Sequence, residues 1–146
     1  MTYELIRKAH ETEESAVNSY MHALSVLRLH GMEMRDLEEV LKKVAIETLI
    51  HRELMNGMLR AYDEALKKDT EALRKLKEIE PSAEEKAIII KLLKDHLLIE
   101  SEMIDHYKEL AQKVPHLVLR DLAEALARNE EEHHQLLSDL IKKYEK

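Results

Sequence analysis

The chain has 146 residues, of which 36% are charged, and its formal net charge at pH 7 is −7. It contains no cysteine, which excludes disulfides, thiol catalysis, cysteine-ligated zinc and iron–sulfur clusters. The negative charge argues against a nucleic-acid partner, and the longest apolar run is too short to cross a bilayer, so we expect no membrane partner either.

The composition indicates long helices in a single domain. The sequence has two Gly and two Pro, and its hydrophobic residues are mostly Leu, Ile, Met and Ala. The length suits one domain, so we expect a single four-helix bundle over residues 1–146. The N-terminus lacks the layout of a signal peptide, which predicts a cytoplasmic protein. Many Glu and Lys with few Asn and Gln indicate a thermophilic source.

Two helices are predicted in the first half of the chain. Apolar residues with the spacing of one helical face predict a helix over about residues 3–30, with Gly31 as its C-terminal cap. A second helix is predicted over about residues 33–68. We expect Asp69 and Thr70 to end this helix, before a short amphipathic turn.

Two further helices are predicted in the second half. Ser82 and Glu85 have the spacing of a capping box and predict a third helix over about residues 82–113. Pro115 ends this helix and is expected in the first turn of a fourth, over about residues 116–144. The turns within each half are short, so the helices of each half are predicted to be antiparallel neighbours.

A pattern of polar residues occurs once in each half. A Glu precedes a Tyr by seven residues, and a His precedes a Tyr by eleven. The pairs are Glu13 and Tyr20, Glu100 and Tyr107, His51 and Tyr62, and His133 and Tyr144. Each Glu and His falls on an apolar helical stripe, where a lone charge is costly unless it is paired or bound to a metal. Two helix pairs with inward carboxylates and imidazoles predict a metal centre inside a bundle.

The heights of these residues agree within each half. Glu13 lies roughly 18 residues before the first turn and His51 roughly 20 after it. At about 1.5 Å per residue, the two residues therefore lie within about one helical turn of the same height along the hairpin. Glu100 lies roughly 15 residues before the second turn, and Glu130 and His133 roughly 15 to 18 after it. The inward polar groups of each half are therefore predicted to face each other.

Three segments resemble the ferritin-like di-iron carboxylate proteins, especially the rubrerythrin group. Residues 126–133, Leu-Ala-Arg-Asn-Glu-Glu-Glu-His, resemble the last-helix motif of that group. The segments from Glu13 to Tyr20 and from Glu100 to Tyr107 resemble its first and third helices. The resemblance implies a ferritin-like four-helix bundle in which two iron ions are held by a Glu from each of two helices and a Glu-x-x-His from each of the other two. This chain lacks the cysteine-ligated iron module that the group often carries.

The resemblance implies a set of six metal ligands with one departure from the family pattern. The family has a Glu three residues before His51, where this chain has Thr48. Glu47 lies four residues before His51 and is the predicted substitute. Without it, the centre would hold one metal, a different metal such as zinc or manganese, or none. The implied ligands are Glu13, Glu47, His51, Glu100, Glu130 and His133.

Two classes of function follow from these residues. The resemblance implies an oxidoreductase of the ferroxidase or peroxidase type, which reacts ferrous iron with dioxygen or peroxide and forms a homodimer. The alternative is a non-enzymatic interaction or structural protein whose site is degraded or binds zinc, and Thr48 favours it. Glu and His four residues apart also stabilise a helix without metal, as in His10–Glu14, Glu47–His51 and His96–Glu100. His10 and His96 are therefore open as further ligands, as hydrogen-bond partners of ligands, or as such pairs.

The connection between the halves bears on topology. In ferritin-like bundles the second and third helices run parallel, so their connection crosses the bundle. About 13 residues extend roughly 43 Å, whereas the crossing needs about 57 Å at the predicted helix bounds. The ferritin-like topology therefore predicts that the second helix ends early, well before Lys68, or that the third begins late, well after Ser82. An up-down-up-down bundle needs no such change.

Overall fold

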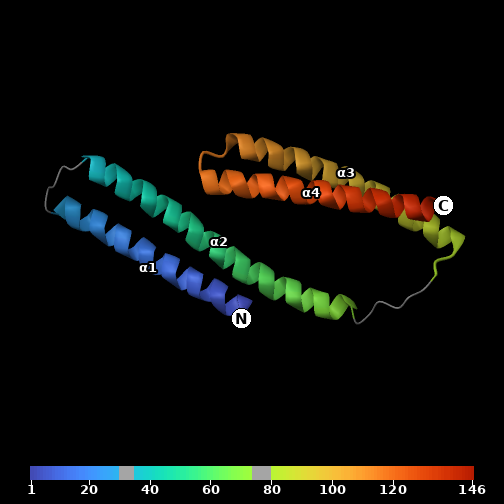
Figure 1. Cartoon of the computed structure of the whole chain (residues 1–146), viewed down its shortest axis with the longest axis horizontal. Helices are drawn as coiled ribbons and strands as arrows, with labels where there is room; N and C mark the ends of the chain where they lie inside the picture. Colours follow the sequence, from blue (N-terminus) through green and yellow to red (C-terminus); the bar gives the residue numbers. More distant parts are fainter. Residues whose placement is uncertain (30–34, 74–79) are drawn as a thin grey trace. The chain divides into compact units, whose positions relative to one another are not determined.

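The described residues form helices and no strand. The computed structural model describes residues 1–29, 35–73 and 80–146. The four helices in this part of the chain are α1 (Thr2–Leu29), α2 (Arg35–Leu73), α3 (Ala83–Lys113) and α4 (Leu117–Glu145) (Figure 1). The predicted all-α fold class is confirmed. The predicted cap at Gly31 lies outside the described residues, as does most of the predicted amphipathic turn.

The chain consists of two compact units, Met1–Lys77 and Glu78–Lys146. In the first unit α1 packs against α2, and in the second α3 packs against α4. Figure 1 shows that each pair is an antiparallel hairpin, as the short turns predict. That residues 1–146 form one domain stays a prediction.

The α2 helix is longer than predicted. It continues through Asp69 and Thr70 to Leu73, so the prediction that these two residues end it is wrong. Neither residue lacks a backbone N–H, and each costs a helix interior less than about 1 kcal/mol relative to Ala. The prediction that α2 ends early or α3 begins late is also wrong, because α3 begins at Ala83.

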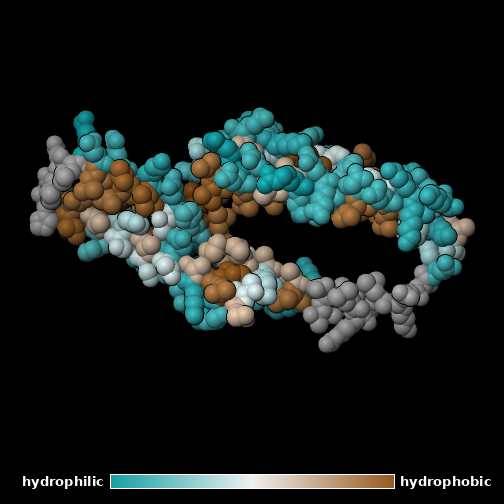
Figure 2. Space-filling model, in the orientation of Figure 1, coloured by the Kyte–Doolittle hydropathy of each residue, from teal (hydrophilic) through white to brown (hydrophobic). Residues whose placement is uncertain are grey.

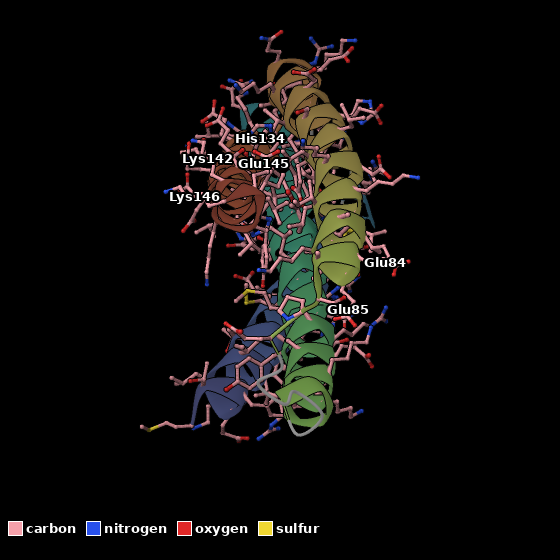
Figure 3. The ribbon with its side chains drawn as sticks, turned by 90° about the vertical axis from the view of Figure 1, so that its right-hand side faces the viewer. Glu84, Glu85, His134, Lys142, Glu145 and Lys146 are labelled. Atoms are coloured by element: carbon pink, nitrogen blue, oxygen red, sulfur yellow. The ribbon has the colours of Figure 1, made fainter. Side chains whose placement is uncertain are left out.

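The first turn of α3 is fixed by the predicted capping box, which is confirmed. The backbone N–H of Glu85 donates to the Ser82 hydroxyl over 3.2 Å, and the N–H of Ser82 donates to the Glu85 carboxylate over 3.2 Å. Figure 3 shows Glu84 and Glu85 at this end of α3. Both carboxylates are also favourable beside the positive end of the helix dipole.

The α4 helix begins at Leu117, one residue later than predicted. His116 is the N-cap of α4, so Pro115 precedes the helix and does not lie in its first turn. Val114 has extended backbone angles, with φ −71° and ψ 124°. The residue before a proline avoids the helical region for steric reasons, which explains why α3 ends at Lys113.

Cross-helix contacts in each hairpin agree with one register. In the first hairpin, Arg28 and Glu38 are 3.7 Å apart near the turn, and at the open end the rings of Tyr3 and Tyr62 have centroids 6.4 Å apart. In the second, Lys108 forms an ion pair with Glu131 over 2.6 Å, and Lys94 with Glu145, labelled in Figure 3, over 2.7 Å. Exposed ion pairs contribute at most about 1 kcal/mol each. Packing between the helices must therefore provide most of the stability.

The helix interface of the second hairpin is built largely from small residues. In the second hairpin Ala111, Ala123 and Ala127 are buried, which lets α3 and α4 approach closely. Many large hydrophobic residues remain exposed on both hairpins, and hydrophobic surface is visible on each in Figure 2. On α3 they recur on one helical face at Ile88, Leu92, Ile99 and Leu110. No helix in the described ranges is long and apolar enough to cross a membrane.

Candidate metal centre

Three predicted ligands meet in the second hairpin. The α3 helix provides Glu100, and α4 provides Glu130 and His133, which project from the same side because they are three residues apart. Glu100 is 5% exposed and Glu130 is 7% exposed, while His133 is partly buried. Two carboxylates and an imidazole are thus held together in the helix interface, with Ala127 one turn away.

The distances in this cluster suit metal ligation. The Nδ1 atom of His133 is 3.2 Å from Oε2 of Glu130 and 3.8 Å from Oε2 of Glu100. One ligand atom from each residue lies within 4.8 Å of the other two. Two ligands of one metal ion, with bonds of about 2.1 Å, are at most about 4.2 Å apart. Both imidazole distances fall within this limit as they stand.

The two carboxyl groups influence each other strongly. Their proximity lets them share a proton, which lowers the pKa of Glu100 and raises the pKa of Glu130. Burial raises the pKa of Glu130 further. In its ionised form Glu100 has a buried Oε2 atom without a hydrogen-bond donor. A cation bound here would replace the shared proton and give this oxygen a partner, so the residues fit a metal ion.

In the first hairpin the carboxylate is more exposed than its counterparts, whereas the two imidazoles are similarly exposed, with His51 at 39% and His133 at 44%. His51 Nδ1 is 3.6 Å from Oε1 of Glu13, and their side chains are 39% and 31% exposed. Thr48, where the family pattern has Glu, is only 7% exposed. Glu47 is partly exposed and forms no ion pair with His51. The structure therefore brings Glu13 and His51 together, as their heights predict, but does not add Glu47 to them.

Only one of the three predicted Glu–His pairs is formed, although all six residues are described. His96 Nε2 is 3.0 Å from Oε1 of Glu100. Neither His10 and Glu14 nor Glu47 and His51 form such a pair. His96 is not a member of the three-residue cluster, because its ring nitrogens do not lie within 4.8 Å of ligand atoms from all three residues at once.

The second hairpin also has two hollows that sequence reasoning did not predict. Their volumes are about 330 and 310 Å³, and both are lined by Lys108 and Glu131 but not by Glu100. His134 lines the smaller one, so Glu131 and His134 repeat the Glu-x-x-His spacing beside this hollow. The Glu131 carboxylate is already paired with Lys108 and raises the pKa of that amine. This second motif therefore offers no free carboxylate for a metal.

Comparison with known proteins identifies one family. A family model described as rubrerythrin matches residues 4–141, which include nearly all of the four helices. Comparison with curated proteins and with solved structures gave no significant match.

Proposed function

Because the chain belongs to the rubrerythrin family, we propose that it is a di-iron carboxylate protein that reacts ferrous iron with dioxygen or peroxide. The observation that carries this proposal is the buried cluster of Glu100, Glu130 and His133, in which one carboxylate oxygen has no partner. A buried anionic oxygen without a donor is destabilising in the metal-free protein and favourable beside a cation.

The ligand types favour iron over magnesium or calcium. Glu100 and Glu130 would provide hard oxygen ligands, and His133 a nitrogen ligand that suits a transition metal. We propose that Glu13 and His51 provide the remaining oxygen and nitrogen, with Glu47 in place of the family's missing Glu. Bound iron would supply the electrons for reduction of the oxidant. The protein would hold the ligands and shield them from water within the helix interfaces.

A second candidate is supported by a specific observation. Thr48 is buried where the family has a ligand, and Glu47 is not directed to His51 by an ion pair. A site with one fewer carboxylate would hold a single zinc or manganese ion, or act only as a structural Glu–His cluster. This candidate predicts fewer than two iron ions per chain.

Metal stoichiometry after anaerobic loading with ferrous iron tests the proposal. We expect about two iron ions per chain by mass spectrometry of the metal, and oxygen consumption on exposure to air. Glu130→Gln should lose most of the iron, because the amide has no negative charge. The matched control is Glu131→Gln, which removes a neighbouring carboxylate that pairs with Lys108. Iron content of one ion would favour the second candidate, and no bound iron would exclude the di-iron function.

We further propose that the protein is a homodimer. Each hairpin taken by itself leaves large apolar residues exposed, such as Val40 and Met58 on α2 and Leu92 and Ile99 on α3. Apolar faces of this extent require a covering surface in a stable soluble assembly. Sedimentation velocity at micromolar concentration should give the mass of two chains. A single-chain mass would contradict the dimer without affecting the metal proposal.

A further inference from the structure

The contact between His96 and Glu100 gives the two carboxylate oxygens of Glu100 different surroundings. Oε1 of Glu100 is 3.0 Å from Nε2 of His96, whereas Oε2 has no donor and lies 3.8 Å from Nδ1 of His133. An ionised carboxylate only accepts hydrogen bonds, so Nε2 of His96 must carry the proton. One oxygen is thus held by His96, and the other lies beside His133.

The carboxylate of Glu100 needs such a restraint. It is on a long side chain with three rotatable bonds, and fixing it in one rotamer carries an entropy penalty. His96 lies one helical turn before it on α3, so the rigid helix sets the position of the donor. The hydrogen bond to Oε1 selects the rotamer in which Oε2 remains within the cluster.

Among the described residues of the first hairpin, Glu13 contacts His51 but has no counterpart of the contact between His96 and Glu100. The residue four before Glu13 is Ala9, which has no donor in its side chain. A histidine four residues before the Glu of the pattern therefore occurs only in the second half of the chain, which is also the half with the buried carboxylates.

We propose that His96 is a positioning residue, which orients the Glu100 carboxylate for metal binding without itself binding the metal. This inference rests on the proposed metal-binding function of the same cluster. The half-exposed imidazole of His96 is outside the group of ligand atoms, which separates its role from that of His133. Hydrogen-bond partners of ligating carboxylates commonly change metal affinity by about 10-fold to 100-fold.

Zinc affinity of the full-length protein tests the positioning role. With Zn²⁺ alone as the probe, His96→Leu should weaken binding by about 10-fold to 100-fold. His96→Gln keeps an N–H donor one turn from Glu100 and should remain within about threefold of wild type. His106→Leu, an exposed histidine on the same helix, is the matched control and should bind as wild type does. Equal affinity of His96→Leu and wild type would overturn the proposal.

The cobalt spectrum separates positioning from ligation. Visible absorption bands of bound Co²⁺ depend on the ligand set. At saturating Co²⁺, His96→Leu should have the bands of wild type, since no ligand has been removed. Shifted bands in both His96→Leu and His96→Gln would show that His96 is a ligand and would overturn the proposal.

Nitrogen NMR of the metal-free protein gives a readout that does not depend on metal. The ring of His96 should be held in the Nε2-protonated tautomer in wild type and released in Glu100→Leu, which has no acceptor, whereas His106 should be the same in both. A His96 ring that resembles His106 in wild type would overturn the proposal. If the tautomer is fixed but wild type binds neither zinc nor iron, the His96–Glu100 contact is supported and the proposed function is the part that fails.

Discussion

Thr48 is the residue at which this chain departs from the family ligand pattern, and its substitution is informative. Thr48→Glu would place a carboxylate in the α1/α2 interface, where Thr48 is 7% exposed. We expect the free energy of unfolding of the metal-free protein to fall by about 1–3 kcal/mol, because a buried acceptor would lack a partner. Bound iron should restore this loss. Thermal melts with and without ferrous iron measure both effects.

Glu47→Gln is the companion variant for this experiment. If Glu47 replaces the missing ligand, its amide should lower the iron content, and combination with Thr48→Glu should restore it. If Glu47→Gln leaves the iron content of wild type unchanged, Glu47 is not a ligand.

Glu130 has a raised pKa and predicts a pH-dependent effect in the metal-free protein. A carboxyl group whose folded pKa is raised stabilises the fold fully below its unfolded pKa, and this contribution is lost as pH rises through the folded pKa. Glu130→Gln imitates the protonated form, and its amide can donate to Oε2 of Glu100. The melting temperature of the metal-free variant should therefore exceed that of wild type at pH 7, with the difference shrinking toward pH 4. A lower melting temperature at pH 7 would contradict the shared-proton account.

The sequence predicted the three clustered residues for a simple geometric reason. Glu130 and His133 are three apart on one helix, and the short turn brings them to the height of Glu100. It could not decide between Thr48 and Glu47, because positions three and four residues before His51 both flank it on a helix. Which oxygen of Glu100 contacts His96 depends on the side-chain rotamers, and residue spacing does not determine these.

At the scale of the element, removal of the capping box of α3 is expected to lower the free energy of unfolding. Ser82→Ala removes the acceptor of the Glu85 N–H. Loss of an N-cap side chain costs about 1 kcal/mol. Urea denaturation should show this decrease, and Ser82→Thr should largely retain the wild-type stability. Ser82→Ala with unchanged stability would indicate that the first turn of α3 contributes nothing to the unfolding equilibrium.

At Gly57 in α2, a substitution is expected to raise the free energy of unfolding. A Cβ atom added there would have nothing within 4 Å. Ala is favoured over Gly in a helix interior by about 0.5–1 kcal/mol because it restricts the unfolded chain. Gly57→Ala should therefore raise the free energy of unfolding by about this amount in urea titrations. A decrease would show that another surface packs against this position in solution.

The two ends of α3 were predicted well because a residue acts there through a specific bond or steric clash. Ser82 and Glu85 set the start of α3 by reciprocal hydrogen bonds, and Pro115 restricts Val114 to extended angles. Asp69 and Thr70 are weak helix formers with neither effect, so α2 continues through them to Leu73. Propensity alone therefore placed the end of α2 five residues too early.

At the scale of the whole molecule, the two hairpins differ in how well their polar clusters are formed. The second hairpin has a group of three possible ligands with two buried carboxylates, whereas the first has the partly exposed pair Glu13 and His51. Metal binding by the second cluster alone would need no contribution from the first hairpin. The proposed di-iron centre needs ligands from both hairpins. An experiment that detects whether metal contacts the first hairpin therefore distinguishes the two proposals.

Amide hydrogen exchange with and without ferrous iron distinguishes them. A ligand that binds only the folded state slows exchange in every segment whose opening releases it. If Glu13 and His51 are ligands, iron should slow exchange around them in α1 and α2 as well as around Glu100 and Glu130 in α3 and α4. Glu13→Gln should then reduce the protection of both hairpins. Protection confined to α3 and α4, and unaffected by Glu13→Gln, would instead assign the metal to the Glu100, Glu130 and His133 cluster alone, as the second candidate function requires.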